Sequence, residues 1–344
     1  RRHAWLNNGR IAGKGGLPAV SRRTPTFAGR FSWSQVDPER RNTILLIAGI
    51  AAVVAIALVL VAYGYYVDRI KPEHETVLKV GDRRFDYAYL ERRVKAETAA
   101  TQVDRNQIAQ VIAAIVSSIE NEELVRQAAS RIGVTVSDQE VEERMRAMLA
   151  LSQQASREVF AARLRQELLT QGLSLREYKE IATAEALARK MRAQFETEVP
   201  AEAEHVDLRI IKLDTREKAE EALTRIRNGE SIATVAATMT TDTATQRTAG
   251  EMGFVPRGAL DPKLEEWAFA NTGVSEPIET DSGFYILESR AQERRAVDSS
   301  GKNRIVSNRL NTLITNTRKE VGSKTSLTIG QAQRLAASLR LSGV

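Results

Sequence analysis

The chain of 344 residues has no cysteine, three histidines and only 5% aromatic residues. Without cysteine, disulfides and thiolate metal sites are excluded. The histidines, His3, His74 and His205, are far apart in sequence, so we predict neither a metal site nor a cofactor. Few aromatics combined with 27% charged residues favour helix-rich soluble domains over an all-β protein.

Acidic residues are scarce in the first 42 residues, which hold nine Arg or Lys residues against Asp37 and Glu39. The net charge of this basic tail is therefore +7. Because the whole chain carries +6, the remainder sums to −1. A near-neutral remainder does not resemble a nucleic-acid-binding protein, so we expect no nucleic-acid partner.

No charged residue occurs from Asn42 to Val67, and 43–62 read TILLIAGIAAVVAIALVLVA. A helix of about 25 residues spans roughly 37 Å, more than the 30 Å or so of a bilayer's hydrocarbon core. We therefore predict a single transmembrane helix at 43–67. A cleaved signal peptide is the alternative, but its apolar run is shorter and lies closer to the N-terminus.

Arginines set the predicted orientation, because positive residues stay on the cytoplasmic side. Arg40 and Arg41 precede the apolar segment, whereas the charges that follow it nearly cancel. The tail, 1–42, is thus expected in the cytoplasm and 68–344 outside the cell membrane. The tail has two interpretations: a disordered arm near anionic lipid, or, given its four aromatic residues, a docking arm for a larger membrane complex.

Residues 68–202 predict a helical module. Val77 to Val80 alternate like a short strand, Gly81 favours a turn, and Asp86 can cap a helix. Apolar residues at three- and four-residue steps predict a long helix over about 104–132. Ser137 with Glu140, and Ser174 with Glu177, are capping boxes that each open a further helix.

The order of these elements resembles the N-terminal chaperone region of SurA-type proteins. The resemblance depends on 77–90 and on the helices around QGLSLREYKE, 171–180. It implies an all-α chaperone module that holds unfolded chains. It also implies that the C-terminal segment, 294–344, returns to this module, with 303–321 packed on the helices of 104–199.

Residues 203–293 predict an α+β domain with a small, mostly antiparallel sheet. Strand patterns at 206–213 and 283–287 bracket helical patterns at 215–227, 231–239 and 264–270. The runs NGESI (228–232), TTD (240–242), AGEMGF (249–254), PRG (256–258) and TDSG (280–283) resemble a parvulin domain. Parvulins are peptidyl-prolyl cis-trans isomerases, and such a domain beside a SurA-like module resembles the membrane-anchored, PpiC-type foldases.

This resemblance implies the site residues. The proline pocket corresponds to Met252, Leu260, Leu264 and Phe269, although Phe269 is alternatively plain core. Thr280 and Ser282 match polar positions that line the site. Asp242 matches a position beside the reacting amide, with an Asx turn as the equal alternative. The two core histidines of the family align with Arg209 and Tyr285, so both are replaced.

Three functions remain open from the sequence. Under the first hypothesis, the chain is an isomerase that helps exported polypeptides with X–Pro bonds to fold. Alternatively, it is a chaperone whose parvulin fold has lost useful catalysis, because the family histidines are absent. The third hypothesis is an accessory subunit of a membrane complex, docked through residues 1–42.

Overall fold

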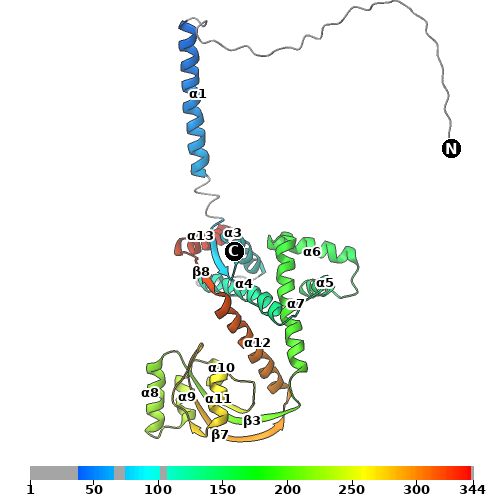
Figure 1. Ribbon diagram of the computed structural model, residues 1–344, viewed down its shortest axis with the longest axis vertical. Helices are drawn as coiled ribbons and strands as arrows, with labels where there is room; N and C mark the ends of the chain where they lie inside the picture. The colour runs from blue at the N-terminus through cyan, green and yellow to red at the C-terminus, as the bar shows by residue number, and fades with distance from the viewer. Residues whose placement is uncertain (1–37, 66–73, 101–106, 342–344) are drawn as a thin grey trace, which may run out of the picture. The chain divides into compact units, whose positions relative to one another are not determined.

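The structure, a computed structural model, describes residues 38–65, 74–100 and 107–341 (Figure 1). The basic tail predicted at 1–42 lies almost wholly outside these residues. We describe helix α1 by itself, and then the part of the chain that follows it.

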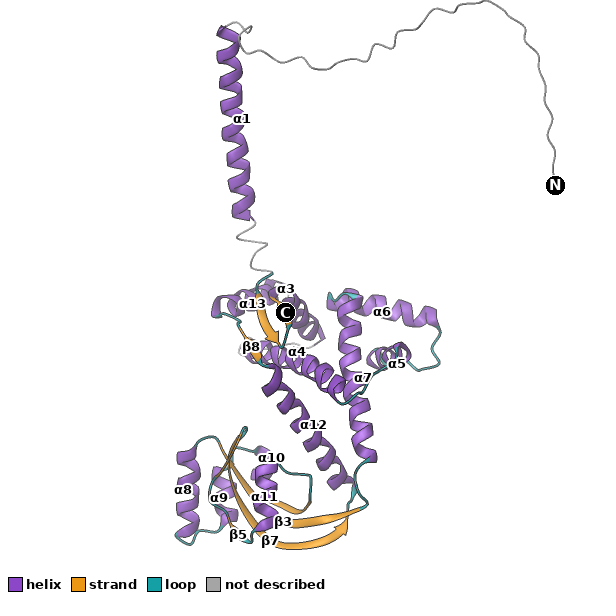
Figure 2. Ribbon diagram, viewed as in Figure 1, coloured by secondary structure: helices purple, strands orange, loops and turns teal. Residues whose placement is uncertain are grey.

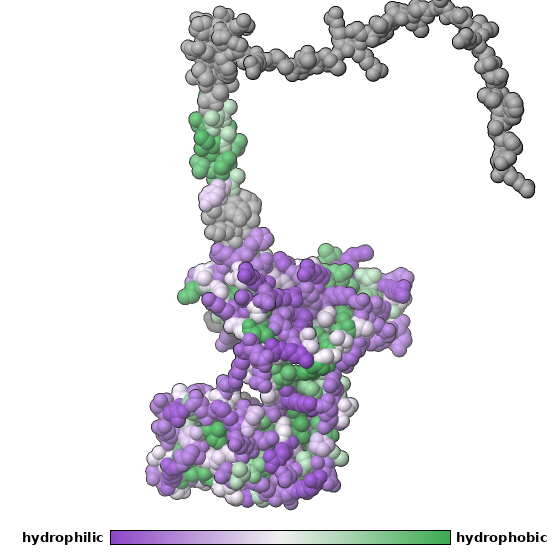
Figure 3. Space-filling view, in the orientation of Figure 1, coloured by the Kyte–Doolittle hydropathy of each residue, from purple (hydrophilic) through white to green (hydrophobic). Residues whose placement is uncertain are grey.

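Helix α1 runs from Pro38 to Tyr65. Large apolar side chains between Ile50 and Tyr63 are exposed, and Figure 3 shows the apolar surface that they form. Among the described residues, no helix has both the length and the apolar character that a membrane crossing requires. The predicted transmembrane segment, 43–67, falls only partly within the described residues.

The helical module begins with a small antiparallel sheet in the order β2-β1-β8. Its strands are β1 (Thr76–Val80), β2 (Arg83–Asp86) and β8 (Ser323–Thr325). The prediction of an all-α module is therefore wrong. Ser323–Thr325 has no strand pattern of its own, and it becomes a strand because β1 offers an unpaired edge.

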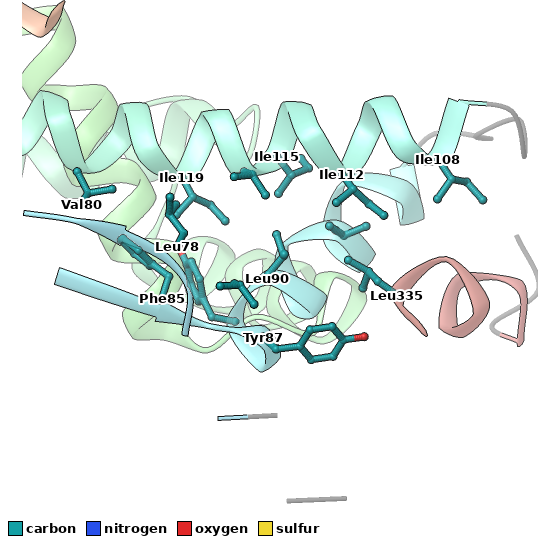
Figure 4. Packing of buried hydrophobic residues seen from close by; sticks show 14 of the residues in the cluster. Leu78, Val80, Phe85, Tyr87, Leu90, Ile108, Ile112, Ile115, Ile119 and Leu335 are labelled. Carbon is teal, nitrogen blue, oxygen red and sulfur yellow. The ribbon is translucent and has the colours of Figure 1, made fainter. Parts of the chain in front are cut away.

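Helices α3 (Tyr87–Ala100) and α4 (Ile108–Arg131) cover this sheet. Asp86 caps α3, as predicted: the backbone N–H of Tyr89 donates to its Oδ1 at 2.8 Å. Figure 4 shows the isoleucines of α4 facing the strands, with Leu335 of α13 (Ile329–Leu341) completing the core. The helical period of the isoleucines thus builds the first core.

Three helices form the rest of the module: α5 (Asp138–Met148), α6 (Arg157–Gln171) and α7 (Leu175–Thr197). Both predicted capping boxes are present, at the starts of α5 and α7. The sequence analysis placed helices around 171–180 but gave no bounds for α6, which buries no residue fully and has no strong apolar stripe. Its capping Ser156 was the available signal.

Helix α12 (Ser299–Val321) follows the α+β domain and leads back to the module (Figure 1). Its residues Leu310, Leu313 and Ile314 pack against buried side chains of α4 and α7, such as Val125 and Met191.

The α+β domain, residues 202–296, contains a five-stranded antiparallel sheet in the order β4-β3-β7-β5, with β6 also paired to β7. Figure 2 shows its two long strands, β3 and β7, side by side. The long central strands are β3 (Glu202–Leu213) and β7 (Gly283–Ala296). The shorter ones are β4 (Glu251–Pro256), β5 (Gly273–Val274) and β6 (Ile278–Thr280). The helices are α8 (Arg216–Arg227), α9 (Ile232–Met239), α10 (Thr243–Arg247) and α11 (Pro262–Ala270).

Candidate active site

The central strands of the α+β domain send alternate side chains to two different faces. On the first face, Ile211, Leu213 and Ile286 pack against α8 and α9. On the second, Leu208, Ile210 and Leu287 are covered by α11 and by the loop after β4. We call these the α8/α9 face and the α11 face.

The predicted pocket residues gather on the α11 face. Leu260 and Leu264 are buried there, whereas Met252, Phe269 and Tyr285 are half-buried members of the same cluster. Phe269 has a second contact, because the guanidinium of Arg257 lies 4.1 Å from its ring centroid. The structure thus places five of the predicted side chains in one apolar group with accessible edges.

Ile210, Trp267 and Ile278 also belong to this cluster, and the sequence analysis did not single them out. Ile210 had a visible signal. Val206, Leu208 and Ile210 alternate along β3, which places them on one face of the strand.

Hydroxyl groups border the apolar cluster. The hydroxyl of Ser282 lies 2.8 Å from that of Tyr285 and 3.2 Å from that of Thr280. Thr280 also donates to the carbonyl of Gly283 at 3.2 Å. The turn between β6 and β7 therefore holds three hydroxyls in a chain beside the apolar side chains.

Gly283 makes this turn possible. Its φ is +125°, and a Cβ there would lie 2.7 Å from the carbonyl oxygen of Leu213. Only glycine allows the backbone to approach β3 so closely in this conformation. The turn, and with it Ser282, depends on that contact.

Asp242 occupies the N-cap of α10. Its carboxylate accepts hydrogen bonds from the backbone N–H of Ala244 at 3.2 Å and from the hydroxyl of Thr245 at 2.9 Å. This geometry corresponds to the Asx-turn alternative. Both contacts keep the carboxylate within its own helix end.

Arg209 lies on the α8/α9 face, away from Tyr285. Its guanidinium donates to Glu251 at 2.7 Å and to Glu288 at 3.1 Å. Arg290 also binds Glu251, and this contact, more than that of Arg209, holds the pKa of the Glu251 carboxyl below its ordinary value. The structure therefore does not bring the two predicted histidine positions together.

Alternation along β3 explains the separation. Val206, Leu208 and Ile210 lie on the α11 face, so Arg209 between them lies on the other face. Because successive side chains alternate, a shift of one residue moves a side chain to the other face. Ile210, not Arg209, shares the face of Tyr285.

Comparisons with known proteins agree with this fold. The PPIC-type PPIASE domain family matches residues 210–291, and the SurA-like N-terminal domain family matches 39–192. The peptidyl-prolyl cis-trans isomerase pin4 of Neurospora crassa is 35% identical over 91 residues, which cover 25% of this chain and 68% of pin4. This chain belongs to the parvulin family. It also carries a SurA-like N-terminal domain.

Matches to two foldases extend over a larger part of the chain than the match to pin4 does. The foldase protein PrsA of Caldanaerobacter subterraneus is 28% identical over 177 residues, which are 51% of this chain and 55% of that protein. This parvulin thus spans about half the length of that relative. The solved structure of PrsA from Streptococcus pneumoniae covers 76% of the chain and 98% of its own, at 17% identity and a TM-score of 0.32.

The site of this parvulin has the groups to contact an apolar ring and to donate a hydrogen bond to a twisted amide. The X–Pro amide resists rotation by about 20 kcal/mol because its C–N bond has partial double-bond character. Met252 offers half-buried apolar surface, with Leu260 and Leu264 buried in the same cluster. Ser282 and Tyr285 provide hydroxyls that can bond the amide as it twists.

Proposed function

We propose that the parvulin domain catalyses cis-trans isomerisation of X–Pro bonds in unfolded polypeptides. The observation that carries this proposal is the hydroxyl chain of Thr280, Ser282 and Tyr285 along the edge of the apolar cluster. A twisted amide loses resonance, so its nitrogen regains a lone pair and becomes a better hydrogen-bond acceptor than in the planar ground state. Groups that bind the twisted form more strongly lower the barrier.

The test is an isomerisation assay with an X–Pro peptide and the full chain. The rate should exceed the uncatalysed rate in proportion to enzyme concentration. Met252→Ala should raise KM by removing pocket surface, whereas Met148→Ala, which alters a half-buried Met of the helical module, should not. A wild-type rate equal to background would overturn the proposal.

A specific observation favours the chaperone alternative. A groove of about 440 Å³ lies between α4 and 325–332, and Ile112, Val116 and Leu327 contribute apolar surface to it. Such a groove could hold an apolar segment of an unfolded chain without any isomerase chemistry. Suppression of client aggregation by a Tyr285→Phe variant without turnover would support this alternative.

We propose, further, that the chain is a membrane-anchored foldase of exported proteins, with its domains outside the cell membrane. The charge-free stretch 42–67 and the exposed apolar residues of α1 support the anchor, and the arginines before it support the orientation. Protease added to intact cells should degrade 74–341. Full protection of that part would contradict this orientation.

A further inference from the structure

One face of helix α12 contacts the parvulin domain. In the N-terminal half of α12, Asn308 donates from its side-chain nitrogen to the carbonyl of Leu260 at 2.6 Å and to that of Gly258 at 3.0 Å. Arg304, one turn earlier, donates to the carbonyl of Met252 at 3.4 Å. All three contacts reach the backbone of segments that carry pocket residues.

The same face makes a second contact near the other end of α12. The ammonium of Lys319 lies 2.5 Å from a carboxylate oxygen of Asp281. Asp281 stands between Thr280 and Ser282 in the turn between β6 and β7. Lys319 also lowers the pKa of the Asp281 carboxyl, mainly through this hydrogen bond.

Helix geometry makes the two contacts compatible. Asn308 and Lys319 are eleven positions apart, which is about three turns, so their side chains project in the same direction. The opposite side of α12 is occupied: Leu310 and Leu313 pack on the helical module, and Arg309 pairs with Glu198 of that module. α12 therefore contacts both modules at once.

We propose that α12 belongs to the isomerase site, with Asn308 and Lys319 as positioning residues. Asn308 holds the loop that carries Leu260, a buried member of the apolar cluster on the α11 face. Lys319 holds the turn that carries the hydroxyls of Thr280 and Ser282. The inference rests on the proposed isomerase function for its kinetic consequence. The contacts of Asn308 and Lys319 with the parvulin domain can be tested without turnover.

The first experiment measures backbone hydrogen exchange in the full chain. Asn308→Ala should speed exchange at Gly258 and Ala259 by about tenfold, because the loop loses two hydrogen bonds. The matched control is Asn303→Ala, an exposed asparagine on the same helix. Equal exchange in the two variants would overturn the role of Asn308.

Lys319→Glu tests the other contact by placing like charges together. Exchange at Ser282 should rise by about fivefold, whereas the exposed Lys302→Glu should leave it unchanged. The double variant Asp281→Lys, Lys319→Asp restores an opposite-charge pair and should return exchange toward the wild-type rate. Failure of this rescue would show that the contact does not position the turn.

The second experiment separates positioning from folding. With an X–Pro peptide, Asn308→Ala should raise KM by about tenfold with little change in kcat, because the apolar cluster binds the proline ring before and during the twist. A loss of folded molecules would instead lower the apparent kcat and leave KM unchanged, and that result would overturn the inference. If wild-type turnover equals background, the proposed function fails. The exchange experiment then still tests whether Asn308 and Lys319 position the loop and the turn.

Discussion

The two faces of the parvulin sheet differ in how completely they are covered. On the α8/α9 face, Ile211, Leu213 and Ile286 are fully buried, and charged residues such as Arg209 and Glu251 pair with each other at its border. On the α11 face, Met252, Phe269 and Tyr285 stay half-buried, and the hydroxyls of Thr280 and Ser282 lie at the edge. One face stabilises the domain, and the other leaves apolar and polar groups accessible to a substrate.

The largest expected effect concerns the buried face. Leu213→Ala should lower the free energy of unfolding by about 3 kcal/mol, because the removed atoms leave a cavity in a closed core. KM for an X–Pro peptide should not change. Guanidinium denaturation and steady-state kinetics measure the two quantities. A raised KM would show that the two faces are not independent.

On the accessible face, Tyr285→Phe removes one hydroxyl and keeps the ring. We expect kcat to fall about tenfold, with unfolding free energy changed by less than about 1 kcal/mol. Tyr178→Phe, in the helical module, is the matched control and should leave kcat unchanged. An active Tyr285→Phe variant would remove the hydroxyl chain from the mechanism.

Arg209→Met tests whether Arg209, which the sequence analysis aligned with a family histidine, takes part in catalysis. It removes a cation that pairs with Glu251 and Glu288 at the border of the α8/α9 face. We expect a loss of about 1 kcal/mol in unfolding free energy and an unchanged kcat/KM. A tenfold drop in kcat/KM without a loss of stability would assign Arg209 to the site despite its position.

The smallest expected effect is the pH dependence of the charged border. The pKa of Glu251 is lowered in the folded chain, mainly by Arg290. The ionised carboxylate therefore adds to the free energy of unfolding above the unfolded pKa of about 4.3. This contribution is lost as pH falls through the folded pKa, and it amounts to less than about 1 kcal/mol because the group is partly exposed. Arg290→Met should make the free energy of unfolding fall less steeply as the pH is lowered. An unchanged slope would show that the pair contributes nothing.

Local features of the fold were predictable from the sequence. The capping boxes at Ser137 and Ser174 depend on residues three positions apart, so the sequence alone predicts both helix starts. The motifs of the α+β domain likewise predicted the antiparallel sheet and the parvulin family. Met252, Leu260 and Leu264 follow from the resemblance to the parvulin family that those motifs carry.

Features that depend on distant partners were not predictable. The irregular register between β3 and β4 at Leu208 and Arg209 arises from the pairing of the two strands, and no local sequence pattern indicates it. The strand at Ser323–Thr325 exists only because β1 accepts it. Asn308 looked like any polar residue on a helix, since its partners are backbone carbonyls far away in the sequence.

The strand β8 has a consequence for the order in which the chain acquires its structure. The first strand of the helical module gains its second neighbour only from residues on the far side of the parvulin domain, and Leu335 then closes the same core. During synthesis, the parvulin domain is therefore complete before the module that surrounds it in sequence. Until those later residues emerge, the edge of β1 is unpaired and the core beside Leu335 is open, and such surfaces favour association with other chains.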